Sequence, residues 1–359
     1  CIAGPSLSAF AECQAEERGV TAVAEEELSQ NGEEKLLDWL KSSQLPLYLS
    51  IDKDILAEEV LKETIDKKEN FGKSTIGRGK NVCVEYSSTN IAKPFHIGHI
   101  RSTVIGDSIK RIYQFLGYNT IAINHLGDYG TQFGMLIYAY KKWGDKKKIE
   151  ENPIDELLKL YVKVNTLAEE DKEVKEECRY WFKELENQNP EAVEIWKWFK
   201  EVSLKEFNRV YKMLDIEFDS YNGESFYSDK MPALIEDLRN RNILEESQGA
   251  EVINLDEYDL PPAIVVKSDG TTIYLTRDLA AAKYRHENYK PFRSIYVVGS
   301  QQSLHFKQLK AALKKAGFDW YDEIIHVAFG MVSLEDGTLS TRKGKVVYLE
   351  DVLNRAIEK

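Results

Sequence analysis

Long apolar segments and paired cysteines are both absent from this sequence. Its 359 residues contain no apolar run near the ~18 residues expected of a membrane-spanning helix, and no signal-peptide pattern. The four cysteines form no C-x-x-C pair, which argues against a disulfide scaffold and against a zinc ribbon. We therefore expect a protein of the reducing cytoplasm that does not cross a membrane and holds no metal ion of its own.

An excess of positive charge is absent too, as are two common motifs. The 48 Lys and Arg residues are outnumbered by 60 Asp and Glu residues, for a net charge of −12. This balance argues mildly against nonspecific coating of nucleic acid but leaves room for a local nucleic-acid contact. No G-x-G-x-x-G follows the first predicted strand, which weakens a nicotinamide-cofactor interpretation. No H-E-x-x-H occurs either, so the pattern of a zinc protease is missing.

Apolar residues follow two kinds of pattern, which alternate along the chain. Short β-branched runs are followed by stretches with helical spacing, which is typical of a parallel α/β sheet. A Lys- and Glu-rich stretch interrupts this alternation, and Asn-Pro pairs at 152–153 and 189–190 indicate helix starts within it. The other predicted elements are a helix around 55–61, strands at 82–86, 120–123, 294–298 and 324–328, a hairpin over 264–275, and helices at 98–116, 130–142, 277–289 and 303–316.

These elements predict an α/β fold, a doubly wound parallel sheet of Rossmann-like type interrupted by a helical insertion. Ligand is expected at the carboxyl ends of the strands. The expected divisions are a truncated N-terminal appended segment at 1–76, the first half of a nucleotide-binding domain at 77–145, a mainly helical insertion at 146–250, the second half at 251–330, and a basic loop with the start of a following region at 331–359. Residues 1–44 suggest no role.

The segment His96-Ile97-Gly98-His99 places two imidazoles one helical turn apart at an expected helix start, just after Pro94. A helix N-terminus directs free backbone N–H groups toward a bound phosphate, and both imidazoles can donate hydrogen bonds to phosphate oxygens. Gly98 would let an adenine ring approach the backbone. The segment predicts attack on the α-phosphate of ATP. Spacing alone leaves open a zinc site or two unrelated surface residues.

A basic loop of small residues lies at 337–345, far along the chain. Its cations Arg342, Lys343 and Lys345 suit a triphosphate that must lose its pyrophosphate. Seen alone, the loop is equally explained as a solvated basic turn.

Together the two elements resemble the HIGH and KMSKS signatures of class I aminoacyl-tRNA synthetases. Segments 85–103 and 124–134 are similar to arginyl-tRNA synthetases almost residue for residue, and the resemblance covers roughly 77–359. It implies the HUP-type domain of class I synthetases and arginine–tRNA ligase activity in translation. The implied substrates are L-arginine, ATP with its Mg²⁺, and tRNA(Arg), with no protein ligand assigned to the Mg²⁺. We also expect the protein to be cytoplasmic and monomeric.

The resemblance also implies an amino-acid site. A guanidinium that loses water needs carboxylates and oriented hydroxyls around it, and the residues implied for the arginine side chain are Glu224, Tyr274 and Asp278. The bland alternatives are an exposed loop acid for Glu224 and a helix N-terminal charge for Asp278. The residues implied for the backbone end of arginine are Glu85, Ser87, Ser88, Asn90 and Gln302, although 88–90 could merely form a turn.

A nucleotide site follows from the same resemblance. The residues implied for ATP are His96, Gly98, His99, Gly299, Gln301 and Lys345, and those implied for catalysis are His96, His99, Lys93, Arg342 and Lys343. Gln301 stands where many class I enzymes carry an aspartate that holds the ribose. Arg342 lies where KMSKS has its second lysine, and Lys93 is proposed to substitute for that lysine.

Several features stay open at this point. His125, Asp128 and Gln132 match strongly without a secure role, and Asp128 is a candidate N-cap; His305 could be a satisfied core histidine. Family members continue into a helical anticodon-binding domain that this chain does not include, so a catalytic-domain fragment or a natural short relative is expected. The resemblance also implies that bound tRNA is commonly needed before arginine is activated, which puts activity of the isolated chain in doubt. The rivals are a noncatalytic RNA-binding or regulatory paralogue and an H-x-G-H nucleotidyltransferase, which leaves the match over 85–103 unexplained.

Overall fold

The computed structural model describes residues 2–4, 22–24, 50–51, 53–330 and 347–358. The chain divides into two compact units, Cys1–Lys73 and Ser74–Lys359. In the first unit, short parallel strands β1 (Ile2–Gly4), β2 (Ala22–Ala24) and β3 (Ser50–Ile51) pair in the order β2-β1-β3, and helix α3 (Lys53–Lys67) covers the predicted helical stretch. No helix in the described part of the chain is long and apolar enough to cross a membrane.

The second unit is built on a sheet of four parallel strands. These are β4 (Asn81–Glu85), β5 (Asn119–Ile123), β9 (Pro291–Gly299) and β10 (Ile324–Phe329), in the order β10-β9-β4-β5. The chain steps outward from β4 to β5 and later from β9 to β10. The strand order therefore reverses between β4 and β9, which confirms the predicted doubly wound sheet and places its switch point there.

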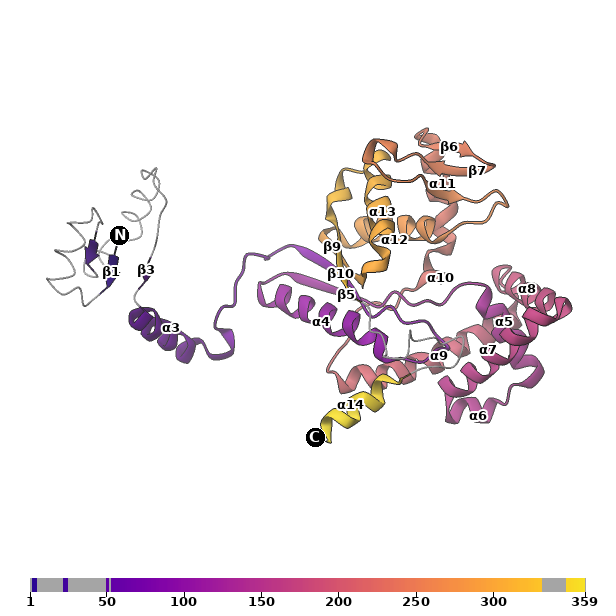
Figure 1. The fold of residues 1–359 in the computed structure, drawn as a ribbon, viewed down its shortest axis with the longest axis horizontal. Coiled ribbons are helices and arrows are strands. Elements are labelled where there is room, and N and C mark those ends of the chain that lie inside the picture. Colours follow the sequence, from indigo (N-terminus) through magenta and orange to yellow (C-terminus); the bar gives the residue numbers. More distant parts are fainter. Residues whose placement is uncertain (1, 5–21, 25–49, 52, 331–346, 359) are drawn as a thin grey trace. The chain divides into compact units, whose positions relative to one another are not determined.

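Both faces of the sheet are buried, and β9 shows why. Its alternate residues enter two different apolar clusters: Ile295 and Val297 pack in one with Tyr86, and Tyr296 packs in the other with Leu309. Successive side chains of a strand point to opposite faces of the sheet, so burial of both sets requires packing against both faces. The covering helices beside the strands are α4 (Ile100–Phe115), α12 (Tyr274–Tyr289) and α13 (Ser303–Lys315) (Figure 1).

A helical insertion separates β5 from the second half of the sheet (Figure 1). Its helices are α5 (Thr131–Trp143), α6 (Lys146–Glu151), α7 (Pro153–Glu170), α8 (Lys172–Glu186) and α9 (Pro190–Met213). Each start that the Asn-Pro pairs indicated is present, with proline in the first turn of α7 and α9. The side chain of Asn189 also accepts the N–H groups of Glu191 and Ala192, which caps α9.

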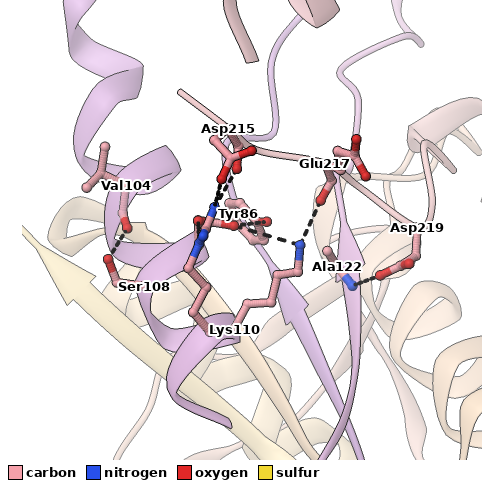
Figure 2. A network of polar contacts seen from close by, with 10 residues as sticks. Tyr86, Val104, Ser108, Lys110, Ala122, Asp215, Glu217 and Asp219 are labelled. Atoms are coloured by element: carbon pink, nitrogen blue, oxygen red, sulfur yellow. Dashed lines mark hydrogen bonds and ion pairs between the residues drawn. The ribbon is translucent and has the colours of Figure 1, made fainter. Parts of the chain in front are cut away.

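The chain returns from the insertion to the sheet along 215–219, and polar contacts fasten this segment (Figure 2). Lys110 Nζ on α4 donates to the carbonyl oxygen of Glu217 at 3.0 Å. The carboxylate of Asp219 accepts the N–H of Ala122, on edge strand β5, at 2.7 Å. The return segment therefore shields part of an otherwise open sheet edge and fixes the point where the chain rejoins the sheet after α9.

A second sheet was missed by sequence analysis, and the predicted hairpin over 264–275 is wrong. Strands β6 (Leu244–Ser247), β7 (Ala250–Ile253) and β8 (Ala263–Val266) form an antiparallel sheet. The tight turn after β8 is present, but Thr272 makes only one bridge, to Val266. Helix α12 begins at Tyr274 because Leu275 and Leu279, at helical spacing, bury their side chains.

The remaining helices lie around these layers. They are α10 (Glu224–Tyr227), α11 (Met231–Asn240), α14 (Leu349–Ile357), and the 3₁₀ turns Ile97–His99, Ser228–Lys230, Asp256–Tyr258, Ser300–Gln302 and Asp319–Glu323. A further 3₁₀ turn, Lys68–Asn70, follows α3 in the first unit. Helix α14 was not predicted.

Candidate active site at the switch point

The two histidines lie on a 3₁₀ turn that follows β4 and leads into α4. Their rings stack with centroids 3.9 Å apart. The N–H of Gly98 donates to His96 Nδ1 at 3.1 Å, and the N–H of His96 donates to His99 Nδ1 at 3.2 Å. Since both Nδ1 atoms are acceptors, this hydrogen-bond network assigns the proton of each neutral ring to Nε2. The pair therefore carries two Nε2–H donors.

Burial keeps both rings uncharged near neutral pH. Desolvation lowers the pKa of His99 to about 3, with a smaller contribution from His96, and it lowers the pKa of His96 as well. Neutral imidazoles with protonated Nε2 atoms act as hydrogen-bond donors rather than as general acids or bases at pH 7. This supports the predicted role of the pair in holding charge on a bound group.

The backbone of this turn differs from the prediction, which expected free N–H groups pointing at a phosphate. The N–H of Ile97 donates to the carbonyl of Val347 at 2.9 Å, that of His99 to the carbonyl of His96 at 2.9 Å, and that of Gly98 to a ring nitrogen. The turn and an antiparallel bridge between His96 and Tyr348 use these donors. The imidazoles, and not the backbone, are left to meet an anion here.

The loop after β4 is held in an unusual backbone conformation. Ser87 and Ser88 have φ of 66° and 46°, in the left-handed region that few residues other than glycine adopt. Ser87 Oγ lies 2.8 Å from Tyr211 Oη and accepts from Thr103 Oγ1 at 2.9 Å. Ser88 Oγ is buried without a protein partner. Asn90, which was predicted alongside them, is exposed.

Glu85, at the end of β4, is already paired. Its carboxylate lies 2.5 Å from Nη1 of Arg285, a guanidinium only 1% exposed on α12. Arg285 Nη2 also lies 3.2 Å from Nδ1 of His125, and that ring stacks on Tyr227. Sequence analysis missed Arg285, because one basic residue inside a helical run carries no signal of burial.

Glu224 is the first residue of α10, and the structure surrounds it with charge. Arg277 Nη1 donates to Glu224 Oε2 at 2.9 Å. Burial nonetheless raises the pKa of the Glu224 carboxyl to about 7, against the opposing effects of Arg277 and Lys93, and Asp278 and Asp128 raise it further. Glu224 is therefore not the exposed loop acid of the bland alternative.

Asp278 lies one turn into α12, opposite the start of α13. Its Oδ2 is 2.6 Å from Nε2 of His305, so the half-buried histidine is a partner of the carboxylate rather than a core residue. Hydrogen bonding and charge from His305 lower the pKa of Asp278 although burial opposes the shift. Tyr274, one turn earlier, is 71% exposed.

The remaining predicted residues are distributed around this edge. Gly299 is buried at the end of β9, and Gln301 and Gln302 are exposed on the 3₁₀ turn that follows. Lys93 is half-buried with Nζ 5.5 Å from the ring centroid of Tyr161. Arg342, Lys343 and Lys345 lie outside the described residues.

Two residues without an assigned role are explained by the structure. Asp128 does not cap the following helix α5, whose N-cap Gly130 makes no side-chain cap bond. It holds the start of α10 instead, accepting from the N–H of Ser225 at 2.8 Å. Gln132 Nε2 donates to the carbonyl of Tyr129 at 3.0 Å and so holds the loop before α5. Among the described residues, no group of three or more His, Cys, Asp or Glu side chains is arranged to hold a metal ion.

Comparison with known proteins agrees with this geometry. Residues 60–359 match the family model of the catalytic domain of class I tRNA synthetases (R). The chain is 61% identical over 309 residues to arginine–tRNA ligase of Halothermothrix orenii and 60% identical to that of Clostridioides difficile, covering 86% of this chain and 55% of each relative. It thus spans about half the length of the curated relatives it matches.

A solved structure shows the same fold. The crystal structure of arginyl-tRNA synthetase from Plasmodium falciparum aligns with a TM-score of 0.67 at 28% sequence identity, covering 96% of this chain and 60% of that one. The family model, the identity to curated relatives and the sheet with its switch point lead to one conclusion: this chain belongs to the arginyl-tRNA synthetases of class I, and residues 60–359 match their catalytic domain.

Proposed function

We propose that this chain activates L-arginine with ATP to form arginyl-adenylate and pyrophosphate, and then transfers arginine to the 3′ end of tRNA(Arg). The proposal is carried by two chemistries that the second unit contains. Two neutral imidazole donors follow β4. Two buried or half-buried carboxylates on α10 and α12, Glu224 and Asp278, are near enough to influence one another's charge.

The first step is an attack by an arginine carboxylate oxygen on the α-phosphorus of ATP. A new P–O bond forms as the bond to pyrophosphate breaks, and negative charge builds on the phosphate oxygens. The Nε2–H groups of His96 and His99 would donate to those oxygens. Because both rings are already neutral, they would donate without a change in protonation state. Lys93 would add positive charge, with Arg342, Lys343 and Lys345 taking the departing pyrophosphate. Positioning would supply most of the remaining rate.

The second step transfers the acyl group. The 2′-hydroxyl of the terminal adenosine of tRNA would attack the arginyl carbonyl carbon, and its proton would pass to a phosphate oxygen of the adenylate. The bond between the carbonyl carbon and the phosphate oxygen would break, and AMP would leave with its electron pair. Gly98, Gly299 and Gln301 would hold the adenosine of the adenylate. Gln301 is a neutral amide, which can still donate to and accept from a ribose diol.

Selection of arginine would depend on the acidic side of the site. Glu224, Asp278 and Tyr274 would surround the guanidinium, and a lysine substrate would leave these carboxylates poorly paired. The ammonium and carboxylate of the substrate would meet residues near the end of β4 and the start of α13. This group comprises Glu85, Ser87, Ser88, Asn90 and Gln302. The unpartnered Ser88 Oγ supports a polar ligand at this point.

We extend the proposal to the setting of the reaction. Mg²⁺ would arrive with ATP and be held by its phosphates, without protein ligands. The halves at 77–145 and 251–330 would bind the adenylate, with the insertion at 146–250 between them. The protein would work as a monomer in the cytoplasm, where translation consumes charged tRNA; buried Cys83 and Cys178, both free thiols, are consistent with that compartment.

Calorimetric titration with a nonhydrolysable arginyl-adenylate analogue tests the proposal, because direct binding avoids any requirement for tRNA. The lysyl counterpart is the matched ligand. We expect the arginyl compound to bind at least about a hundredfold more tightly, roughly 2.7 kcal/mol, and Asp278→Ala to abolish the difference. Absence of binding to the folded chain would favour a noncatalytic RNA-binding or regulatory paralogue. Equal binding of both analogues would show that the site holds the adenylate without selecting arginine.

A further inference from the structure

Asp128 is the most enclosed carboxylate near the site. Its side chain is 0% exposed, and three donors surround it. Lys200 Nζ lies 2.7 Å from Oδ2, Ser225 Oγ donates to Oδ2 at 2.8 Å, and the N–H of Ser225 donates to Oδ1 at 2.8 Å. A buried carboxylate with this many charge-assisted bonds has one position available to it.

The residue that Asp128 holds is next to Glu224. Ser225 is the second residue of α10, and Glu224 is the first. The N–H of Glu224 also donates to the carbonyl of Leu126 at 2.9 Å. Gly223 approaches so closely that a Cβ there would lie 2.4 Å from the Leu126 carbonyl oxygen and 2.6 Å from Asp128 Oδ1. The loop at 126–128 is therefore the surface on which Glu224 is placed.

The cation of this arrangement comes from the helical insertion. Lys200 lies on α9, and its side chain is 24% exposed. One turn earlier on the same helix, Trp196 Nε1 donates to the carbonyl oxygen of Asp128 at 2.9 Å. Helix α9 thus holds both the backbone and the side chain of Asp128.

We propose that Lys200 is a positioning residue for amino-acid selection: from the helical insertion, it holds Asp128 in place, and Asp128 holds α10 so that the Glu224 carboxylate meets the guanidinium of the substrate. The inference rests on the proposed function and deepens it. Lys200 touches neither substrate nor nucleotide in this scheme. Without its cation, the Asp128 carboxylate is buried with only the Ser225 donors, so the loop and α10 shift to let water reach it.

The test compares Lys200→Met with Lys197→Met in the full 359-residue chain. Lys197 is an exposed lysine on the same helix and is the matched control. Two nonhydrolysable adenylate analogues are titrated, one arginyl and one alanyl, which shares the adenosine and ammonium but has no guanidinium. We expect Lys200→Met to weaken the arginyl compound at least about tenfold and the alanyl compound less than about twofold, and Lys197→Met to change neither.

Other variants keep the inference open to refutation if Lys200→Met does not fold. Ser225→Ala removes one of the three donors and leaves the backbone N–H, so we expect the same selective loss at a smaller size. Lys200→Arg keeps the charge, and we expect it to recover most of the arginyl affinity. Equal weakening of both analogues by a folded Lys200→Met, or no weakening, overturns the positioning role, since a purely structural residue would not act on the guanidinium alone.

The unmodified chain separates this inference from the proposed function. If it binds neither analogue, the proposed function fails. If it binds the arginyl analogue selectively and Lys200→Met binds it equally well, only the positioning role of Lys200 fails.

Discussion

The two sides of the site are built in different ways. On the side proposed to bind the nucleotide, called the nucleotide side below, His96 and His99 are oriented by hydrogen bonds within a four-residue turn. On the side proposed to bind arginine, called the amino-acid side below, Glu224 is oriented by the 126–128 loop and by Arg277, residues that are distant in sequence. Local bonds make the first side dependent on a short motif, whereas the second depends on the packing of the whole unit.

The comparison also concerns charge. Burial leaves the imidazoles of the nucleotide side neutral. On the amino-acid side, burial acts on carboxylates that are accompanied by internal guanidinium groups on α12. A substrate guanidinium would therefore enter a region where Arg277 already shares one of the acids. Mutations should separate the two sides.

The largest expected effect is on the amino-acid side. Replacing Arg285 with Met leaves the Glu85 carboxylate buried without its cation, so we expect the free energy of unfolding to fall by about 3–5 kcal/mol. Denaturant unfolding followed by circular dichroism measures this loss. The double variant Glu85→Gln, Arg285→Met removes the unpaired charge and should recover part of the stability. A single variant as stable as the parent would show that the pair is not needed to build this side.

A smaller effect, on the activation free energy of adenylate formation, is expected at Lys93. Lys93→Ala should slow adenylate formation by at least about a hundredfold, or roughly 2.7 kcal/mol of barrier, because the cation would stabilise charge developing on the phosphate. Pyrophosphate exchange with tRNA(Arg) present measures the rate. Lys163→Ala, an exposed lysine stacked on Trp143, is the matched control. An unchanged rate in folded Lys93→Ala would remove Lys93 from the chemistry.

The third effect in size is the pH dependence of arginyl-analogue binding, which we expect to come from the amino-acid side. Glu224 has its pKa raised from 4.5 to about 7, so it is ionised above about pH 7 and protonated below. A cationic side chain binds the ionised form, and we expect affinity for the arginyl analogue to fall about tenfold from about pH 8 to about pH 6. Titrations at both pH values with parent and Glu224→Gln test this. The variant should lose the dependence; a dependence that persists would assign it to another group.

The same shift has a consequence for stability. Because the folded pKa of Glu224 is higher than its ordinary value, the folded state binds the proton more tightly than the unfolded state. Its contribution to stability is therefore present below about pH 4.5 and lost as the pH rises toward about 7.

The smallest effect is expected where neither side is involved. Arg209 on α9 pairs with Glu350 on α14, and the arginine side chain is 50% exposed. Solvent screens such a pair, so Arg209→Ala should lower the free energy of unfolding by about 1 kcal/mol or less. Thermal unfolding measures it, and binding of the arginyl analogue should be unchanged. Selective loss of arginyl affinity would extend the amino-acid side to α14.

The elements around the histidine segment could be predicted well from sequence. The histidine segment, the strand before it and the helix after it are all present where they were expected. The use of backbone N–H groups was wrong, since the partner Val347 lies about 250 residues away and no local pattern identifies it. The hairpin at 264–275 failed similarly, because burial of Leu275 and Leu279 favours a helix over strand propensity.

The sequence by itself determined the family, the alternation of strands and helices, and the histidine motif, because each of these is written in neighbouring residues. Only the tertiary structure decided that Arg285 neutralises Glu85, that Asp128 bonds to the start of α10 rather than capping α5, and that His305 holds Asp278. These partners come from segments far apart in the chain. A buried charged group is stable only when it is paired, but which partner lies within reach depends on the packing.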